Sequence, residues 1–184
     1  MSLKKFLSIV FITFFSYLFL HHLQMLVYSG NFFIEEVNAY AYSVYMPHGL
    51  RILFFLIYGF WSIPGLLIAH FVSSLETDFI NSFHQLLSIN IATICVPLTA
   101  LALEKNFKEI ENKFNLKYLI FLTLLSAFIN GFFTNFYRYL TIFEKNFVRF
   151  YDEFFGYFIG DILGVILILC TYLVNKRVFL LSIK

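Results

Sequence analysis

An acidic side chain inside an apolar run is the residue of this sequence most able to do chemistry. Asp161 stands in the step Gly160-Asp161-Ile162-Leu163-Gly164, and no other charge occurs from there to Val174. An ionised carboxylate at the centre of a membrane helix costs about 2.5–3.5 kcal/mol on insertion scales. It needs a cationic partner, a proton or a water-filled cavity. Asp161 is therefore the first candidate for a functional site.

Two arginines are candidate partners for this carboxylate. Arg51 lies near the start of an apolar segment, and Arg138 lies near the end of another. Because an arginine fork matches a carboxylate with two hydrogen bonds, we expect Asp161 to pair with one of them. In an alternative interpretation, the pair only fixes helix packing and Arg138 extends to the outer surface. Ionisable groups inside spans commonly mark a pathway or ligand site, which favours function for Asp161 and Arg51.

Further polar residues share one helical face. Asn130, Thr134 and Arg138 are spaced four residues apart, so they lie one above another, and Ala127 and Gly131 beside them permit close helix approach. A histidine in such a bundle is either a pH switch or, more commonly, a hydrogen-bonded packing residue. The predicted ligand site or intramembrane polar cluster comprises Arg51, Asp161, Arg138, Asn130, His48, His70 and Asn90.

No motif for catalysis or metal binding accompanies these residues. The sequence contains no nucleophile elbow, zinc-ligand helix or phosphate loop. Asp152 and Glu153 are adjacent, so they project in different directions, and we expect both at the outer interface. A net charge of +2 without a long basic run argues against nucleic-acid binding. We therefore predict no enzyme and no metal site, while the sequence leaves the identity of any cofactor open.

The composition requires that lipid covers part of the surface. Of the 184 residues, 60% are hydrophobic and only 13% are charged, which is more apolar surface than a soluble domain of this length can hide. We predict one domain over 1–184 with an all-α fold, a polytopic transmembrane helical bundle. Its expected membrane segments, about six in number, are 6–27, 48–59, 63–75, 79–103, 118–139 and 154–174, with an amphipathic connector at 105–117.

The stretch from 48 to 75 is predicted as a hairpin of two short helices. Gly59 lowers helix propensity, and Pro64 removes a backbone donor and disfavours helix in the residue before it. The lysines at 4–5 and 105–117 and the pair Lys176 and Arg177 belong on the cytoplasmic side. If the hairpin crosses the membrane twice, all three groups of basic residues lie on the cytoplasmic side. We thus expect a bacterial inner-membrane protein with both termini in the cytoplasm.

The order of these motifs resembles the MASE1 family of bacterial integral-membrane sensory domains. That family begins its core with an aromatic–Pro–x–Gly step, continues with a short helix ending in Gly and a helix led by Pro-Gly, and closes with Gly-Asp-x-x-Gly. The resemblance covers about 40–104 and 150–174, and Asn90 corresponds to a family asparagine. The matching structural-motif positions are Pro47, Gly49, Gly59, Pro64, Gly65, Gly160 and Gly164.

The resemblance implies a sensory function. Family members are commonly fused to cytoplasmic diguanylate cyclase, phosphodiesterase or histidine kinase modules, whereas the tail 175–184 is too short for such a domain. We therefore expect a ligand- or partner-binding sensory module that acts through another membrane or cytoplasmic protein, with a small-molecule ligand as one option. The alternatives are a transporter or transporter subunit, supported by the broken segment 47–65, and a structural subunit of a larger membrane complex.

Overall fold

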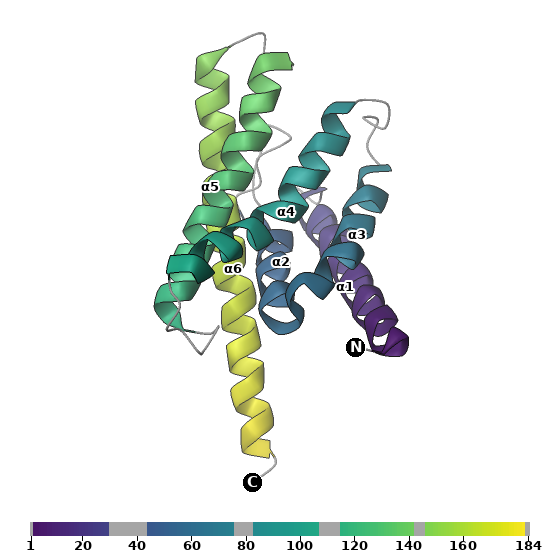
Figure 1. Ribbon diagram of the computed structural model, residues 1–184. Helices are drawn as coiled ribbons and strands as arrows, with labels where there is room; N and C mark the ends of the chain where they lie inside the picture. Colours follow the sequence, from purple (N-terminus) through teal and green to yellow (C-terminus); the bar gives the residue numbers. More distant parts are fainter. Residues whose placement is uncertain (1, 30–43, 76–82, 107–114, 142–145, 183–184) are drawn as a thin grey trace.

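The architecture of the chain is entirely helical wherever it is regular. A computed structural model describes residues 2–29, 44–75, 83–106, 115–141 and 146–182, and these residues contain no strand. The predicted all-α class is therefore confirmed. Residues 107–114 of the predicted amphipathic connector lie outside the described residues. The elements are α1 Leu3–Ser29, α2 Met46–Tyr58, the 3-10 helix η1 Gly59–Ser62, α3 Ile63–Leu75, α4 Phe83–Asn106, α5 Leu116–Thr141 and α6 Phe147–Ser182 (Figure 1).

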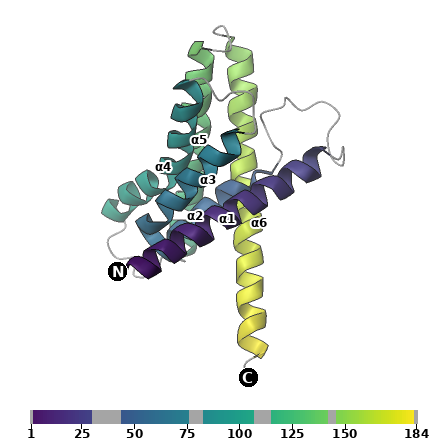
Figure 2. The same cartoon turned by 90° about the vertical axis from the view of Figure 1, so that its right-hand side faces the viewer.

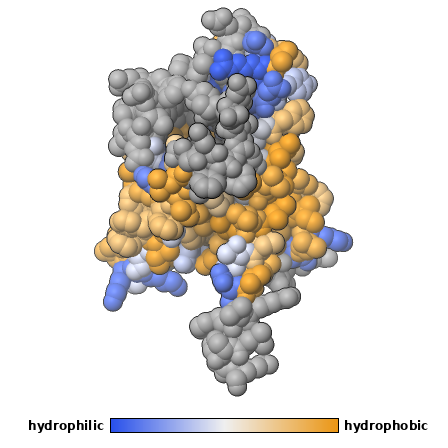
Figure 3. All heavy atoms as spheres, turned by 180° about the vertical axis from the view of Figure 1, so that it is seen from behind, coloured by the Kyte–Doolittle hydropathy of each residue, from blue (hydrophilic) through white to orange (hydrophobic). Residues whose placement is uncertain are grey.

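Several of these helices are suited to cross a membrane. Figure 3 shows hydrophobic side chains across the middle of the molecule, with hydrophilic ones at its upper end and along its lower edge. Helix α4 contributes only a shorter apolar stretch, Ile89–Leu103. Within the described part of the chain there are four candidate spans, and the count of about six stays a prediction. These spans are Leu3–Leu26, Met46–Ser73, Leu116–Leu140 and Phe147–Asn175.

The span Met46–Ser73 is not one straight helix, because the chain reverses direction at η1 (Figure 1). Gly59 at this point has φ +61°, a left-handed conformation that glycine adopts without a steric penalty. The 13 residues of α2 and of α3 each extend for about 20 Å, less than the hydrocarbon thickness of about 30 Å. The geometry is that of a short helical hairpin.

Contacts with α1 define the directions of the two hairpin helices. Phe6, near the start of α1, packs edge-on against Trp61 of η1, with ring centroids 5.8 Å apart. Tyr17, farther along α1, packs against His70 of α3 at 4.6 Å. Helix α3 therefore runs beside α1 in the same direction, as Figure 2 also shows. Helix α2 starts at Met46, beside the far half of α1, and runs the opposite way.

The main apolar core lies where α2, α4, α5 and α6 meet. Helix α4 contains Pro97, which removes a backbone hydrogen bond, and Figure 1 shows α4 changing direction along its length. The bend lets the second half of α4 reach both α2 and α5. The buried side chains of this core are Ile52, Phe55, Leu56, Cys95, Val96, Ala100, Leu103, Tyr118, Leu122 and Val165.

Helices α5 and α6 form an antiparallel pair that extends beyond the other helices (Figures 1 and 2). Aromatic rings join the two: Phe154 packs edge-on against Phe128 at 5.7 Å and against Phe132 at 6.4 Å. Gly131 faces Phe154 of α6, and a Cβ added there would lie in ordinary contact, 3.4 Å from the Phe154 carbonyl oxygen. Figure 1 also places the N-terminus, the start of α5 and the C-terminus at one end of the molecule.

Candidate functional site

The Gly-Asp-x-x-Gly step is the place where α6 meets the first turn of α2. The backbone N–H of Tyr45 donates a hydrogen bond to the carbonyl of Gly160 at 2.8 Å. A Cβ on Gly164 would collide with the Tyr45 carbonyl, and a Cβ on Gly49 would lie 2.5 Å from the Gly164 carbonyl oxygen. Glycine at these positions therefore lets the two helices touch, so that side chains of α2 reach Asp161.

The other predicted motif residues fix the ends of the hairpin helices. Pro47 lies in the first turn of α2, where its missing N–H leaves no helical bond unmade. The Met46 N–H donates to the Gln24 side-chain carbonyl at 3.1 Å, which ties this turn to α1. Pro64 lies in the first turn of α3. Gly65 packs against α1, because a Cβ there would collide with the side chain of Thr13.

Arg51 is the centre of a buried polar network. Its side chain is 1% exposed, and one terminal nitrogen lies 2.6 Å from Nε2 of His70 and donates to the hydroxyls of Tyr17 at 3.3 Å and Tyr45 at 3.4 Å. The other terminal nitrogen lies 3.2 Å from Nδ1 of His48. The guanidinium also lies over both tyrosine rings, 5.8 and 5.4 Å from their centroids. Arg51 thereby links α1, α2 and α3.

Asp161 continues this network into α5 and α6. Its side chain is fully buried, and Oδ2 accepts a hydrogen bond from Asn130 at 2.7 Å. Nδ1 of His48 lies 3.6 Å from the same oxygen, while Nε2 of His48 lies 3.1 Å from the hydroxyl of Ser126. This set, called here the Arg51 cluster, is buried except for the half-buried Tyr45. Its members are Tyr17, Tyr45, His48, Arg51, His70, Ser126, Asn130 and Asp161.

The predicted pair between Asp161 and an arginine is not formed. His48 stands one helical turn before Arg51 on α2 and occupies the position next to the carboxylate. Arg51 instead donates hydrogen bonds to Tyr17 of α1, to His70 of α3 and to Tyr45, which lies just before α2. The Arg51 guanidinium and the Asp161 carboxylate both lie near the same imidazole nitrogen, Nδ1 of His48.

Arg138 belongs to a separate group, called here the Arg138 cluster, formed with Tyr157 and Glu153. Its side chain is 14% exposed; it donates to the Tyr157 hydroxyl at 3.2 Å and lies 3.8 Å from Glu153. The predicted position of Asp152 and Glu153 at the outer interface stays a prediction. The Glu153 side chain is fully buried, whereas Asp152 is exposed. The reason is spacing, because Glu153, Tyr157 and Asp161 follow at four-residue intervals on α6 and face α5.

Asn90 lies on α4 with an exposed side chain, unlike the buried histidines and Arg51. Its predicted grouping with Arg51 and Asp161 stays a prediction. Tyr17 and Tyr45 were not among the predicted site residues, although both bond Arg51. Tyr17 is one of 12 tyrosines, and nothing in its sequence context separates it from the others.

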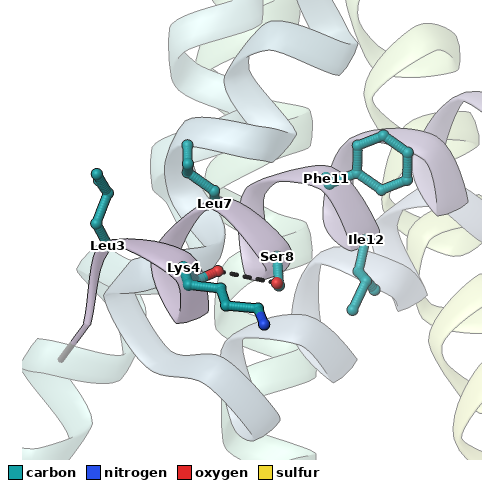
Figure 4. A pocket seen from close by; sticks show the side chains of 6 residues that line it. All are labelled: Leu3, Lys4, Leu7, Ser8, Phe11 and Ile12. Carbon is teal, nitrogen blue, oxygen red and sulfur yellow. Dashed lines mark hydrogen bonds between the residues drawn. The ribbon is translucent and has the colours of Figure 1, made fainter.

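Other features of the surface offer less chemistry. A hollow runs along the outer face of α1, where Figure 4 shows mostly apolar side chains and a hydrogen bond from the Ser8 hydroxyl to the Lys4 carbonyl at 2.9 Å. A groove between α5 and α6, near Leu119 and Val165, is almost wholly apolar. Both suit contact with lipid. Among the described residues, no group of three or more His, Cys, Asp or Glu side chains is placed to hold a metal ion.

The Arg51 cluster brings together several ionisable groups within the bundle: a guanidinium, a carboxylate, two imidazoles and two phenols. These groups can bind anions, exchange protons or respond to a change in helix packing. No protein-family model, curated protein or solved structure matches this chain.

Proposed function

We propose that this chain is a small, MASE1-like integral membrane sensory module of the bacterial inner membrane. It binds a ligand or a partner within its helical bundle and acts through a separate membrane or cytoplasmic protein. The observation that supports this most is the Arg51 cluster, which joins α1, α2, α3, α5 and α6 through buried polar side chains.

The cluster explains how a signal spreads through the bundle. A bond lost at one member leaves a buried polar atom without a partner, which costs about 1–3 kcal/mol. A ligand that prefers one arrangement of the cluster shifts the population of helix packings. Because Asp161 and Arg51 are held by different helices, such a shift moves α6 relative to α1 and α3. The C-terminal end of α6 is the part that a partner protein would read.

The orientation of the proposed module follows from its lysines. The N-terminus, the start of α5 and the C-terminus lie at one end of the molecule in Figure 1, and each has lysine within or next to it in the sequence. Cytoplasmic loops carry an excess of lysine and arginine. We therefore place both termini in the cytoplasm, with α2 and α3 as two of six membrane segments.

A distance measurement across the bundle tests the sensory function. Spin labels are attached to cysteines introduced at Leu3 and Asn175, both exposed, after Cys95 and Cys170 are replaced by alanine. Pulsed electron paramagnetic resonance then reports the distance between α1 and α6 in lipid nanodiscs. Small carboxylates, phosphates and amines are added one at a time as candidate ligands. We expect at least one compound to shift the distance distribution.

Two variants separate a specific response from a general one. Asp161→Ala should abolish the shift while membrane insertion is preserved, and Asp152→Ala, which changes an exposed carboxylate on the same helix, should leave it intact. A distance distribution that no compound changes, or a shift that survives in Asp161→Ala, would contradict the proposal.

A transporter is the second candidate, favoured by the hairpin of α2 and α3. Short helices that end inside a bundle present oriented backbone dipoles, and such broken helices form substrate sites in transporters. Uptake of a labelled compound by proteoliposomes containing only this protein would support transport. A compound that shifts the distance distribution without being taken up would support the sensory function instead.

A further inference from the structure

Two stripes of polar side chains face each other between α5 and α6. They start at Asp161, the central residue of the span Phe147–Asn175, and end in the Arg138 cluster. The bond from Asn130 to Asp161 closes one end, and the bond from Arg138 to Tyr157 closes the other. We call this facing set the α5–α6 seam. Its members are Asn130, Thr134, Asn135 and Arg138 of α5, and Glu153, Tyr157 and Asp161 of α6.

The seam is rich in buried oxygen atoms that have no hydrogen-bond partner in the protein. Each of the side chains concerned is at most 6% exposed. A buried acceptor without a donor costs about 1–3 kcal/mol, so that such atoms are normally satisfied by ordered water or by an added proton. Water or an added proton can supply donors to these oxygens. The oxygens are Asn130 Oδ1, Thr134 Oγ1, Asn135 Oδ1, both carboxylate oxygens of Glu153, and Asp161 Oδ1.

Water and protons fit these acceptors better than a metal cation does. Arg51 lies beyond His48 at one end of the seam and Arg138 lies at the other, and both positive charges oppose a further cation. The hydroxyls of Thr134 and Tyr157 can each donate and accept, as a proton relay requires. Carboxylates stand at both ends and can each take up a proton.

The pattern of hydrogen-bond donors and acceptors around Asp161 allows one more proton to bind there. A guanidinium only donates, so Nδ1 of His48 accepts from Arg51, and the imidazole proton is on Nε2, facing Ser126. Nδ1 and the Asp161 Oδ2 are then two acceptors 3.6 Å apart. A proton on either group turns one of them into a donor. Behind Arg51, the titratable groups that face this pair are Tyr17, Tyr45 and His70.

Glu153 has a different set of neighbours. Arg138 faces it from α5, Tyr157 lies one turn farther along α6, and the exposed Arg149 and Asp152 lie on its own helix. Glu153 and Asp161 are eight residues apart, which is about 12 Å along a helix. A proton cannot pass directly between them, so intermediate hydroxyls and water are needed.

We propose that the α5–α6 seam is a hydrated proton pathway that leads from Glu153 to the pair formed by Asp161 and His48. A hydronium ion gives its proton to the Glu153 carboxylate, and a water molecule remains. The proton then passes through water and the hydroxyls of Tyr157 and Thr134 to Asp161, and Glu153 becomes a carboxylate again. This inference goes beyond the sensory function and does not depend on it.

Infrared spectroscopy of the protein in nanodiscs tests the pathway. The carboxylic C=O band of Asp161 is identified by its loss in Asp161→Asn, and its shift after transfer to D₂O gives the exchange rate. We expect Thr134→Val and Glu153→Gln each to slow this exchange about tenfold, which corresponds to about 1.4 kcal/mol of added barrier. Thr134→Ser keeps the hydroxyl and should exchange as fast as the unchanged protein.

Thr99→Val is the matched control. Thr99 is fully buried on α4, and its hydroxyl bonds the carbonyl of Cys95 at 2.7 Å, away from the seam. It should not change the exchange rate. Exchange in Thr134→Val and Glu153→Gln that is as fast as in Thr99→Val would overturn the pathway. So would the absence, from acid to alkaline pH, of any carboxylic band that Asp161→Asn removes.

Discussion

Arg51 and Arg138 show how the surroundings of the same side chain decide its role. Arg51 is 1% exposed and contacts polar groups of α1, α2 and α3, whereas Arg138 is 14% exposed and contacts Tyr157 and Glu153 of α6. Arg51 lies where several helices meet, so it couples them. Arg138 lies near the end of a two-helix extension, so its effects stay local. We therefore expect the greater burial of Arg51 and its bonds to several helices to act together.

The largest expected effect comes from removing the guanidinium of the Arg51 cluster. Arg51→Leu leaves the hydroxyls and imidazoles around it without their donor and Asp161 without the nearest positive charge. Removing one partner of a buried charged network costs about 3–5 kcal/mol. We expect this loss in the free energy of unfolding, measured by reversible denaturation in mixed micelles. The stability of Arg51→Lys should lie between that of the unchanged protein and that of Arg51→Leu. A loss below about 1 kcal/mol for Arg51→Leu would contradict the coupling role.

The next effect concerns the contact that places the Arg51 cluster against α6. In Gly164→Ala the added methyl group would collide with the Tyr45 carbonyl, so α2 has to shift. Overpacking of this kind costs about 1–3 kcal/mol. Gly131→Ala, between α5 and α6, is the control. Its added Cβ would lie 3.4 Å from the nearest atom, and alanine favours the helix by up to about 1 kcal/mol. Equal midpoints of thermal unfolding for both variants would show that the α2–α6 contact is looser than described.

Arg138→Gln should have a smaller effect than Arg51→Leu. The side chain is partly exposed and the distance to Glu153 is 3.8 Å, so the ion pair contributes about 1 kcal/mol or less. The same unfolding measurement in micelles reports the difference. A loss as large as that of Arg51→Leu would show that the Arg138 cluster also couples distant helices.

The smallest effect is expected for Glu153→Gln. Both oxygens of this buried carboxylate have no hydrogen-bond partner, so a neutral amide of the same shape should change stability by less than about 0.5 kcal/mol or raise it. Thermal unfolding of Glu153→Gln and Arg138→Gln, measured side by side, shows which of the two variants is less stable. If Glu153→Gln proved the more destabilising of the two, Glu153 would be a stabilising ion-pair partner rather than a carboxylate that lacks a hydrogen-bond donor.

Much of the architecture could be read from periodicity and composition. The apolar segments became helices, the break at Gly59 and Pro64 became the hairpin, and Asn130, Thr134 and Arg138 share a face of α5. These features depend on local backbone geometry, which repeats along a helix and can therefore be predicted. Helix α6, Phe147–Ser182, extends beyond the predicted membrane segment 154–174 at both ends, because apolar periodicity does not mark where a helix leaves the membrane.

Residue types and their order were enough to predict a helical, apolar chain in which the charges of Asp161 and Arg51 are costly. The partners of these two charges depend on how the helices pack against one another. Asp161 meets Asn130 and His48 because glycines bring α2 onto α6, and Arg51 meets Tyr17 because α1 crosses beside it. The physical reason is that a helix fixes which side chains share a face, whereas the neighbour of that face depends on the packing of all helices together.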